Sequence, residues 1–495
     1  MITTALSLRR ARQSLLAGVI LGLAAGPAFS ATILVPQDFT TIQEAVDAAT
    51  NGDRIIVGNG VYTGVGNRDI DFLGKQVVVE SLNGPGSCII DCEGLGRAFI
   101  FQTGETVDSI VRGIGMRNGM AASGGAVLMM SASPTIVGCV FEDNTALGTT
   151  EFVDGKGGAI ACFGASSPLI DRCGFFGNRA IASDDNPIGG LLTGIGGAIA
   201  LGGGTDALIT TSTFVGNQAM SPAIVGSGFG GAISTELFAS PLSLTVLGSK
   251  FKNNSASIAG GAVFLFGSNQ VTIEDTAFAS NSGQSSGAIA FQTGMDLTVR
   301  RSLFLENTAR EEITFGVPDV QEQIGGGAIG GGTDSVLLLE DSIFLGNRAL
   351  AGRGGAVSCV DNTTSLIIRC HFEDNEAALQ GGAVTNQEAP SVAPFSSDLL
   401  SNPSVMEMVD CMLLGNSSGV MGGAVANLEG SLLTMTTSTF GDGNTAPVGA
   451  TFVSVGRSSD DTTASVTTLN QMITECTLSI IETGIAVDGG LARTE

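Results

Sequence analysis

The chain offers few side chains of the types that carry acid–base or nucleophilic chemistry. Its 495 residues include one His, one Tyr and no Trp. His371 comes one residue before a Phe of a recurring motif, where the alternation of a strand directs it outward to solvent. No carboxylate or hydroxyl pattern surrounds it that would suit a catalytic base. We therefore predict a surface histidine and assign no catalytic residue.

Acidic pairs are the next residues that could bind a ligand. Asp184-Asp185, Glu311-Glu312 and Asp460-Asp461 have neither the spacing of an EF-hand nor that of the nonapeptide calcium repeat, and charge runs are normally solvated. The triple glycines that begin at Gly202 and Gly330 lack the following Lys and helix of a phosphate-binding loop. The sequence therefore predicts no metal, cofactor or phosphate site.

The cysteines show no zinc or redox spacing. They are Cys88, Cys92, Cys139, Cys162, Cys173, Cys359, Cys370, Cys411 and Cys476. Cys139 and Cys173 occupy the same position of adjacent repeats, as do Cys370 and Cys411, so each pair would lie about 4.8 Å apart. That spacing is within reach of a disulfide, but side chains in register point the same way and give a poor dihedral angle. We predict buried reduced thiols, with disulfides as the alternative.

Glycine departs most clearly from an average composition. The 72 glycines are roughly twice the usual share, and they show no three-residue period, which excludes collagen. A hydrophobic fraction of 43% with 25 Phe excludes a disordered chain. The net charge of −25 argues against a nucleic acid or anionic lipid partner, because both require a basic surface.

Two motifs recur in phase and account for much of this glycine. The glycine motif, Gly-Gly-Ala-Ile/Val, begins at Gly124, Gly157, Gly196, Gly230, Gly260, Gly326, Gly354, Gly381 and Gly422, with a variant at Ser286. The Phe motif, Phe-x-x-Asn, begins at Phe141, Phe175, Phe214, Phe251, Phe278, Phe304, Phe344 and Phe372, with variants at Leu413 and Phe440. In seven of ten repeats 18 residues separate the first glycine from the Phe, whereas the return to the next glycine motif takes 8 to 22. One fixed half and one variable half indicate a coil with a loop at one corner.

The fixed half predicts two strands, of which segments 336–344 and 365–372 are typical second members. Turns of two or three short strands would stack into an all-β, right-handed parallel β-helix, a single-stranded solenoid. Paired glycines would allow positive φ and close backbone approach, and the Phe residues would form an inward column. Asn would occupy the following turn in the left-handed region, with amides bonded from coil to coil. Cys, Ser or Thr two residues before each Phe would form a second inward column.

The amino terminus predicts export. Arg9, Arg10 and Arg12 precede an apolar run over residues 14–26, and small residues end at Ser30 before Ala31, which is typical of a cleaved secretory signal. The run is too short for a membrane anchor, and no later stretch is long and apolar enough to span a bilayer. We expect no transmembrane segment after signal cleavage.

The mature chain opens differently from the repeats. Thr41-Ile-Gln-Glu44 is a capping box that begins a short N-terminal capping helix, whose apolar stripe includes Ile42, Ala45, Val46 and Ala49. Short strands are expected at Arg54–Val57, Gln76–Ser81, Cys88–Asp91 and Ala98–Phe101. The predicted organisation is a signal peptide (1–30), a cap with the first coils (31–123), the repeat β-helix (124–444) and degenerate terminal coils (445–495). Gly449-Ala450 and Cys476-Thr-Leu478 are expected to continue the columns of the repeat.

Two family resemblances follow from these motifs. The alternation of glycine and Phe motifs over residues 124–444 resembles the repeat of polymorphic outer membrane proteins, the chlamydial-type surface passengers. Residues 34–62, from Leu-Val-Pro-Gln-Asp-Phe to Gly-Val-Tyr, resemble the opening of pectin-lyase-like β-helix proteins, including pectinesterases. The first resemblance implies a protein of the cell outer membrane or surface, and the second implies fold more than activity.

The variable segments are the strongest indication of a binding site. Segments 145–156, 179–195 and 218–229 all follow the Asn in consecutive coils and so leave the same corner; segment 308–325 does so later, and segment 388–407 interrupts the fixed half. Insertions confined to one edge of a solenoid often form its recognition surface. The alternative is that they are tolerated surface loops, since long loops cost little stability.

The sequence favours a secreted or surface-associated structural or adhesive module that binds a surface glycan or protein through these loops. A polysaccharide-active enzyme such as a pectate lyase, polygalacturonase or pectinesterase is the alternative. Such chemistry needs paired carboxylates or basic groups in a groove, and sugar subsites usually need exposed aromatic platforms. A single His excludes a Gly-His-Gly element, and without Trp such platforms are scarce. An S-layer or extracellular-matrix component is the second alternative.

Overall fold

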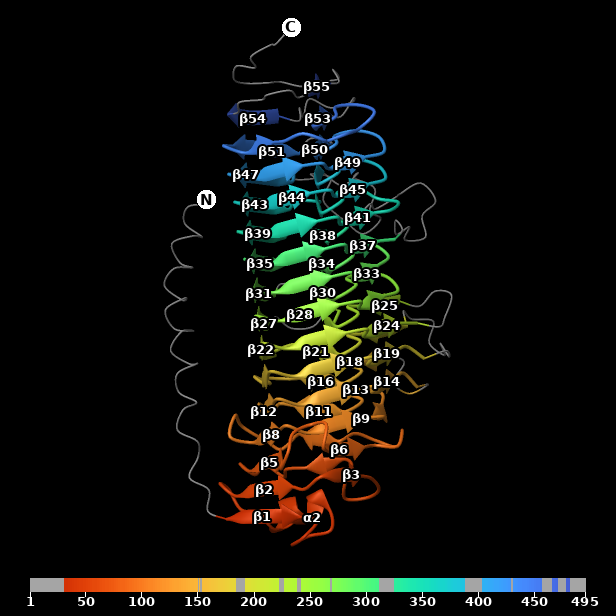
Figure 1. Ribbon diagram of the computed structural model, residues 1–495, viewed down its shortest axis with the longest axis vertical. Helices are drawn as coiled ribbons and strands as arrows, with labels where there is room; N and C mark the ends of the chain where they lie inside the picture. The colour runs from red at the N-terminus through yellow and green to blue at the C-terminus, as the bar shows by residue number, and fades with distance from the viewer. Residues whose placement is uncertain are drawn as a thin grey trace.

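The computed structural model shows a tall parallel β-helix in which the chain rises coil by coil from its N-terminal end (Figure 1). The described residues are 31–149, 151, 154–183, 192–221, 227–237, 242–267, 269–310, 325–387, 403–428, 431–455, 465–470 and 478–480. The predicted signal at residues 1–30 lies outside them. All paired strands in the described part of the chain are parallel, which confirms the predicted all-β solenoid.

Four long sheets run along the solenoid, and each coil contributes one strand to each in turn. The glycine sheet follows the glycine motif and consists of β4 (Ile70–Asp71), β7 (Phe99–Phe101), β11 (Val127–Met130), β16 (Ile160–Phe163), β21 (Ile199–Leu201), β26 (Ile233–Thr235), β30 (Val263–Phe266), β34 (Ile289–Gln292), β38 (Ile329–Gly332), β42 (Val357–Val360), β46 (Val384–Gln387), β50 (Val425–Leu428), β53 (Phe452–Val455) and β55 (Leu478–Ile480).

The middle sheet comes next along each coil. It consists of β1 (Thr32–Val35), β2 (Arg54–Val57), β5 (Val78–Ser81), β8 (Ile110–Arg112), β12 (Thr135–Val137), β17 (Leu169–Asp171), β22 (Asp206–Thr210), β27 (Ser243–Leu247), β31 (Gln270–Glu274), β35 (Asp296–Arg300), β39 (Val336–Glu340), β43 (Thr364–Ile368), β47 (Val405–Val409), β51 (Leu432–Thr436) and β54 (Ser465–Asn470). Strand β2 of this sheet and β6 (Cys88–Asp91) of the next sheet have the predicted bounds. Strand β5 of this sheet begins at Val78 and β7 of the glycine sheet begins at Phe99, both later than predicted.

The Phe sheet carries the Phe motif. It consists of β3 (Gly60–Tyr62), β6 (Cys88–Asp91), β9 (Gly115–Arg117), β13 (Val140–Glu142), β18 (Gly174–Phe176), β23 (Thr213–Val215), β28 (Lys250–Lys252), β32 (Ala277–Ala279), β36 (Leu303–Leu305), β40 (Ile343–Leu345), β44 (His371–Glu373), β48 (Met412–Leu414) and β52 (Thr439–Phe440).

The closing sheet follows the Asn of each repeat. It consists of β10 (Met120–Ala121), β14 (Thr145–Leu147), β19 (Arg179–Ile181), β24 (Gln218–Met220), β29 (Ser255–Ala256), β33 (Ser282–Gly283), β37 (Thr308–Ala309), β41 (Arg348–Ala349), β45 (Glu376–Ala377) and β49 (Ser417–Ser418). A regular coil therefore has four strands. The prediction of two or three strands per turn is wrong.

The extra strand arises because the predicted strand 336–344 breaks at Asp341. Asp341 has φ 52°, a left-handed conformation that turns the chain between β39 and β40. The equivalent residues Arg301 and Arg369 have φ 47° and 51°. A charged residue rather than glycine thus makes this corner. The strand propensity of the residues on either side gave no sign of the turn.

The inward Phe column is confirmed. From Phe141 to Phe372, eight buried rings stack with centroid separations of 4.6 to 4.9 Å and interplanar angles of at most 10°. The spacing equals that of adjacent strands, so register alone places ring on ring. Burial of each ring contributes roughly 2 kcal/mol or more. The predicted column of Cys, Ser and Thr is also buried.

The Asn residues form a continuous hydrogen-bonded column, as predicted. In its middle, Asn254 Nδ2 donates to Asn281 Oδ1 at 2.9 Å and to the carbonyl of Phe214 at 3.0 Å. Its Oδ1 accepts from Asn217 N at 3.0 Å and Asn217 Nδ2 at 2.9 Å. The prediction that this Asn is left-handed is wrong. The preceding residue, here Asn253 with φ 55°, makes the turn and leaves the Asn side chain free to point inward.

The paired glycines have two different tasks, both predicted. The first, such as Gly196 with φ 64°, takes the left-handed conformation. The second has no room for a side chain: a Cβ on Gly197 would lie 2.6 Å from Gln218 N, and Gln218 follows the Asn of the same coil. The glycine motif and the Phe motif therefore meet where the coil closes. This closure explains why the number of residues between them is so constant.

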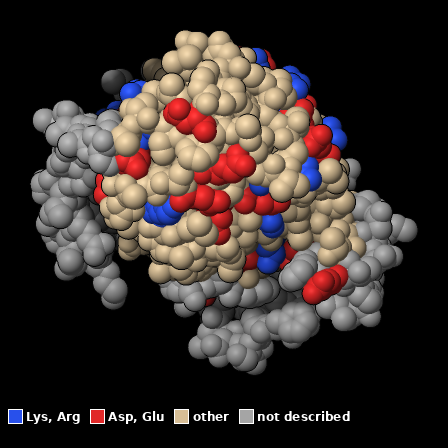
Figure 2. All heavy atoms as spheres, turned by 90° about the horizontal axis from the view of Figure 1, so that it is seen from below, with Lys and Arg blue, Asp and Glu red and all other residues tan. Residues whose placement is uncertain are grey.

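The N-terminal end is capped by α2 (Ile42–Ala48), as predicted. Both hydrogen bonds of the capping box between Thr41 and Glu44 are present, and Ile42, Ala45 and Val46 are buried. In Figure 2, acidic side chains gather near the middle of this end face and basic ones lie toward its rim. A charged cap of this kind opposes end-to-end stacking of solenoids.

The last described coils follow the prediction in part. Gly449 has φ 59° and continues the first-glycine column, and the carbonyl of Ala450 lies against Gly423 as a second glycine would. Leu478 does not continue the Phe column: it lies in β55, paired with Phe452 of the glycine sheet. Cys476 lies outside the described residues.

Candidate functional site

The three predicted binding segments lie on one edge of the solenoid, and their bases are strands rather than loops. Each begins in the closing sheet, at β14, β19 and β24, and returns in a short edge sheet of β15 (Gly155–Lys156), β20 (Thr193–Ile195) and β25 (Ser227–Phe229). The edge sheet is parallel and in register, with Gly155 opposite Gly194 and Gly194 opposite Gly228. Residues 150, 152–153, 184–191 and 222–226 of these segments lie outside the described residues.

Glycine sets the edge sheet directly against the closing sheet. A Cβ on Gly194 would lie 2.5 Å from the carbonyl oxygens of Ala180 and Met220. Gly155 and Gly228 are equally close to the carbonyls of neighbouring closing strands. Each of the three repeats reads Gly-x-Gly-Gly at this point, a signal that was present in the sequence and was missed. Gly352 has the same spacing without an edge strand, so the signal alone would not have sufficed.

Charged side chains tie the edge to the coil. Lys156 Nζ lies 2.7 Å from Glu236 Oε1 and 3.7 Å from Asp154 Oδ2, and 6.0 Å from the ring centroid of Phe163. Asp154 Oδ1 accepts hydrogen bonds from the backbone N and the hydroxyl of Thr193, at 3.0 and 2.6 Å. Lys156 and Glu236 belong to coils on either side of the β21 coil, so these contacts join three coils at the base of the edge.

His371 lies on the outer face of the Phe sheet, half-buried, as predicted. Its Nε2 lies 2.9 Å from Glu373 Oε2, two residues along the same strand. The acidic pairs Asp184-Asp185, Glu311-Glu312 and Asp460-Asp461 lie outside the described residues. Within the described ranges, no group of three or more His, Cys, Asp or Glu side chains is placed to hold a metal ion.

All eight described cysteines are free and buried. Burial raises the pKa of Cys88, Cys92, Cys162 and Cys359 to about 12 and that of Cys411 to about 11. Thiols held protonated in this way are poor nucleophiles and metal ligands. Burial is as predicted, and the redox state in the exported protein stays a prediction.

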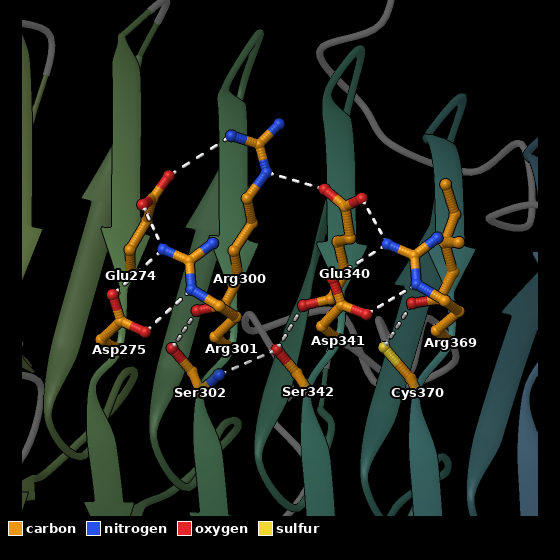
Figure 3. Close-up of polar contacts among 11 residues, drawn as sticks. Glu274, Asp275, Arg300, Arg301, Ser302, Glu340, Asp341, Ser342, Arg369 and Cys370 are labelled. Carbon is orange, nitrogen blue, oxygen red and sulfur yellow. Dashed lines mark hydrogen bonds and ion pairs between the residues drawn. The ribbon is translucent and has the colours of Figure 1, made fainter. Parts of the chain in front are cut away.

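Sequence reasoning missed a column of ion pairs along the corner between the middle and Phe sheets (Figure 3). Glu274-Asp275, Arg300-Arg301, Glu340-Asp341 and Arg369 lie on four successive coils. Arg301 Nε lies 2.9 Å from Asp275 Oδ1, and Arg369 Nε lies 2.7 Å from Asp341 Oδ1. Arg300 joins Glu274 at 3.3 Å and Glu340 at 2.9 Å.

The ion pairs involve all four carboxylates of this column. Hydrogen bonds from Arg301 and Arg369 lower the pKa values of Asp275 and Asp341 below their usual range. Carboxylates held ionised by two arginine contacts suit a structural role better than proton transfer. The signal was available in four successive repeats: the residues just before Thr276, Ser302, Ser342 and Cys370 alternate between acidic and basic.

Two segments match a family model, that of the Chlamydia polymorphic membrane protein repeat, at residues 138–162 and 211–236. Each match contains a complete Phe motif and the complete glycine motif that follows it. Each also spans one of the three edge segments. Comparison with curated protein sequences finds no match. No helix in the described ranges is both long and apolar enough to cross a membrane.

Among solved structures, the chain is similar to the alginate lyase AlyF-OU02 in complex with G6, with TM-score 0.39, 12% identity and coverage of 87% of this chain and 86% of that one. It is also similar to a mannuronic acid specific polysaccharide family 6 lyase from human gut microbiota, with TM-score 0.32, 12% identity and coverage of 87% of each chain. The catalytic domain of a GH87 α-1,3-glucanase in complex with tetrasaccharides is similar with TM-score 0.35, 10% identity and coverage of 88% of this chain and 69% of that one. Similarity of this size transfers no activity. What the comparisons establish is that residues 138–162 and 211–236 are repeats of the Chlamydia polymorphic membrane protein type.

Proposed function

We propose that this chain is an exported, surface-associated scaffold that binds a surface glycan or protein through the edge formed by segments 145–156, 179–195 and 218–229. The observation that carries the proposal is the edge sheet, which anchors the ends of three insertions in register on consecutive coils. The secretory signal predicted at residues 1–30 and the matched membrane protein repeat support export and a surface location.

The arrangement suits adhesion physically. Adjacent coils are about 4.8 Å apart, so three insertions leaving one corner offer a contact surface about 10 Å along the solenoid, before the width of the insertions is counted. Glycine contacts and the Lys156 ion pairs hold their bases in place. A rigid base beneath variable loops is the usual design of a recognition surface.

The test replaces 149–153, 184–191 and 222–226 together with two-residue turns and leaves the edge strands intact. We expect the purified variant to lose retention on whole cells while its circular dichroism and urea midpoint stay near those of the parent. The matched control shortens 311–324, which follows the same corner three coils after segment 218–229, and should retain binding.

Three outcomes would contradict the proposal. Unchanged cell retention in the triple variant would show that the edge is not the binding surface. If the protein released unsaturated or reducing sugar from acidic polysaccharides, and every loop variant kept this activity, an enzyme would be favoured instead. Self-assembled sheets without retention on cells would favour a matrix component.

A further inference from the structure

The outer face of the Phe sheet carries an exposed apolar strip on the opposite side of each strand from the Phe column. In a strand of three residues whose middle side chain points inward, the first and third point outward. From β36 to β48 the outward residues are mostly large and apolar: Leu303, Leu305, Ile343, Leu345, Met412 and Leu414. Ile343 and Met412 are each 43% exposed, and the four leucines are partly buried.

In a strand with one face toward solvent, the outward residues are usually polar. The apolar outward residues of this strip depart from that alternation. It is bounded on its N-terminal side by Lys250 and Lys252 of β28, both exposed. His371 and Glu373 of β44 are its polar members and bond to each other. A contiguous exposed apolar patch on a protein in water commonly marks an interaction surface.

The two borders of the strip carry opposite charges in each of three successive coils. On the border with the middle sheet stand Arg301, Asp341 and Arg369, with side chains 47%, 41% and 46% exposed. On the border with the closing sheet, the same coils present exposed residues of the reverse sign: Glu306 two residues after its Phe, Arg348 four residues after its Phe, and Asp374 and Glu376 at these two positions of the third coil. Within one chain Arg348 Nε lies 3.5 Å from Glu376 Oε2, both side chains being more than half exposed. The sign alternates along each border and reverses across the strip.

We propose that this face binds a second copy of the chain, with the two solenoids parallel, coils in register and a two-fold axis running along them between the two strips. Such an axis exchanges the two borders, so that residue i of one copy meets residue j of the other and the reverse. Arg301 then faces Glu306 of the second copy, Asp341 faces Arg348, and Arg369 faces Glu376.

The same operation matches the interior of the strip. Leu303 of one copy packs against Leu305 of the other, and Ile343 against Leu345, so the apolar residues form the centre and the charges the rim. His371 meets Glu373 of the second copy. An antiparallel pairing centred between β36 and β40 would also join opposite charges, but it would set His371 and Glu373 against Ala277 and Ala279. The parallel arrangement places opposite charges together on the borders and also sets His371 against Glu373.

The size of the face predicts a weak dimer. The five strands of the Phe sheet from β32 to β48 span about 25 Å along the solenoid, and a strand of three residues is about 10 Å long. The apolar centre is therefore smaller than the roughly 800 Å² per partner of a stable interface, even with its charged rim. We expect a dissociation constant on the order of micromolar, which favours dimers where copies are crowded. The inference is independent of the proposed recognition edge, which lies on other sheets.

Sedimentation equilibrium of the mature chain from about 1 to 100 µM tests the pairing. We expect a concentration-dependent dimer, weakened at least about tenfold by Ile343→Glu. Val336→Glu is the matched control, because Val336 is an outward residue of the same coil, 40% exposed, on the middle sheet. It should leave the dimer unchanged. Should Ile343→Glu disturb folding, Arg348→Glu is the second variant; it sets an acid opposite Asp341 and should also weaken the dimer.

Cross-linking tests the orientation. A mixture of the single variants Leu303→Cys and Leu305→Cys should give a cross-linked dimer with a short bismaleimide, because these positions meet across the parallel axis. A mixture of the single variants Leu303→Cys and Ile343→Cys, whose positions meet between copies only in the antiparallel pairing, should give no more cross-link than either variant alone. Single variants are mixed because Leu303 and Ile343 are register partners within one chain and a double variant would be bridged internally. The eight described native thiols are buried, and the parent chain measures any background. A parent that stays monomeric, an Ile343→Glu variant that dimerises like the parent, or cross-linked dimers in the second mixture alone would overturn the proposal.

Discussion

The coils before Gly124 and those after it solve the same packing problem in different ways. In the first coils, Phe72 packs its ring edgewise on Phe99 and Phe101, at interplanar angles of 80° and 65°. Each buried polar group there finds its own hydrogen-bond partners, which are not repeated in other coils. Asn67 Oδ1 accepts from Ile42 N at 3.0 Å, and Lys75 Nζ lies 2.8 Å from the carbonyls of Val46 and Asp47 at the end of α2.

In the repeat, one solution serves every coil. Each Phe stacks on its own equivalent, and each Asn bonds to the next Asn with its amide donors and acceptor satisfied. The difference shows what repetition provides: a side chain that satisfies its neighbour above also satisfies its neighbour below. Only the end of the stack needs residues used once, such as the Thr41 cap. Substitutions should therefore cost most in the repeat, where a single change affects two interfaces.

The largest effect is expected at a closure glycine. Gly197→Ala would place a Cβ against the backbone of Gln218 and Gly231, which are not free to move, and should destabilise the chain by about 4 kcal/mol or more or prevent folding. Gly216→Asn is the control in the same coil: its φ is 65°, it has open space, and Asn253 fills the equivalent position. Urea unfolding followed by circular dichroism measures both. Equal midpoints would contradict the closure account.

The second effect is expected in the Asn column. Asn254→Ala leaves the amide of Asn217 and the Oδ1 of Asn281 short of buried partners and should cost about 3 kcal/mol. The neighbouring Asn253→Gly should be nearly neutral, since Asn253 is exposed and left-handed. If the two variants unfold at the same urea concentration, the column does not stabilise the stack as described.

A smaller effect is expected at the cap. Thr41→Ala removes the side chain that accepts from Glu44 N and should cost about 1 kcal/mol, detected as a lower urea midpoint or as earlier proteolysis of the first coils. Thr41→Ser keeps the acceptor and should behave like the parent. A Thr41→Ala loss as large as that of Asn254→Ala would remove the distinction between the two regions.

The smallest effect is expected in the corner ion pairs. Because Arg301 and Arg369 lower the pKa values of Asp275 and Asp341, their contribution is present above the unfolded value near 3.8 and is lost as pH falls through the lower folded values. Arg301→Gln with Arg369→Gln should cost less than about 1 kcal/mol per exposed pair at pH 7. The difference from the parent should diminish as pH falls below 3.8 and should also shrink in salt.

Arg172→Gln is the control for this comparison. Arg172 occupies the same left-handed corner, but among the described residues its ion pair is with the adjacent Asp171, at 2.9 Å, and its side chain is 67% exposed. Its removal should change little at any pH. A pH dependence as large as that of the double variant would mean that contacts between coils are not the source of the effect.

The two motifs made the solenoid predictable because each of their residues has a required direction. Phe251 and Asn254 recur at one phase, and only a stacked coil places such residues on top of one another. The left-handed corner at Asp341 was not predictable from propensity, because Asp and Arg are uncommon there and the corner depends on contacts with adjacent coils. The edge sheet was missed because the Gly-x-Gly-Gly spacing alone does not show which glycines, such as Gly194, lie against another strand; Gly352 has the same spacing without an edge strand.

The central claim is that one coil is the repeating unit and that the two motifs set its phase. Deleting 272–297 removes one coil and joins Val271 to Thr298, which lies in register with Thr272. Deleting 272–298 removes one residue more and turns the Phe304 side chain outward. The measurement is the urea midpoint of both. We predict a cooperative transition near that of the parent for the first deletion and no folded protein for the second; equal behaviour of the two would contradict the account.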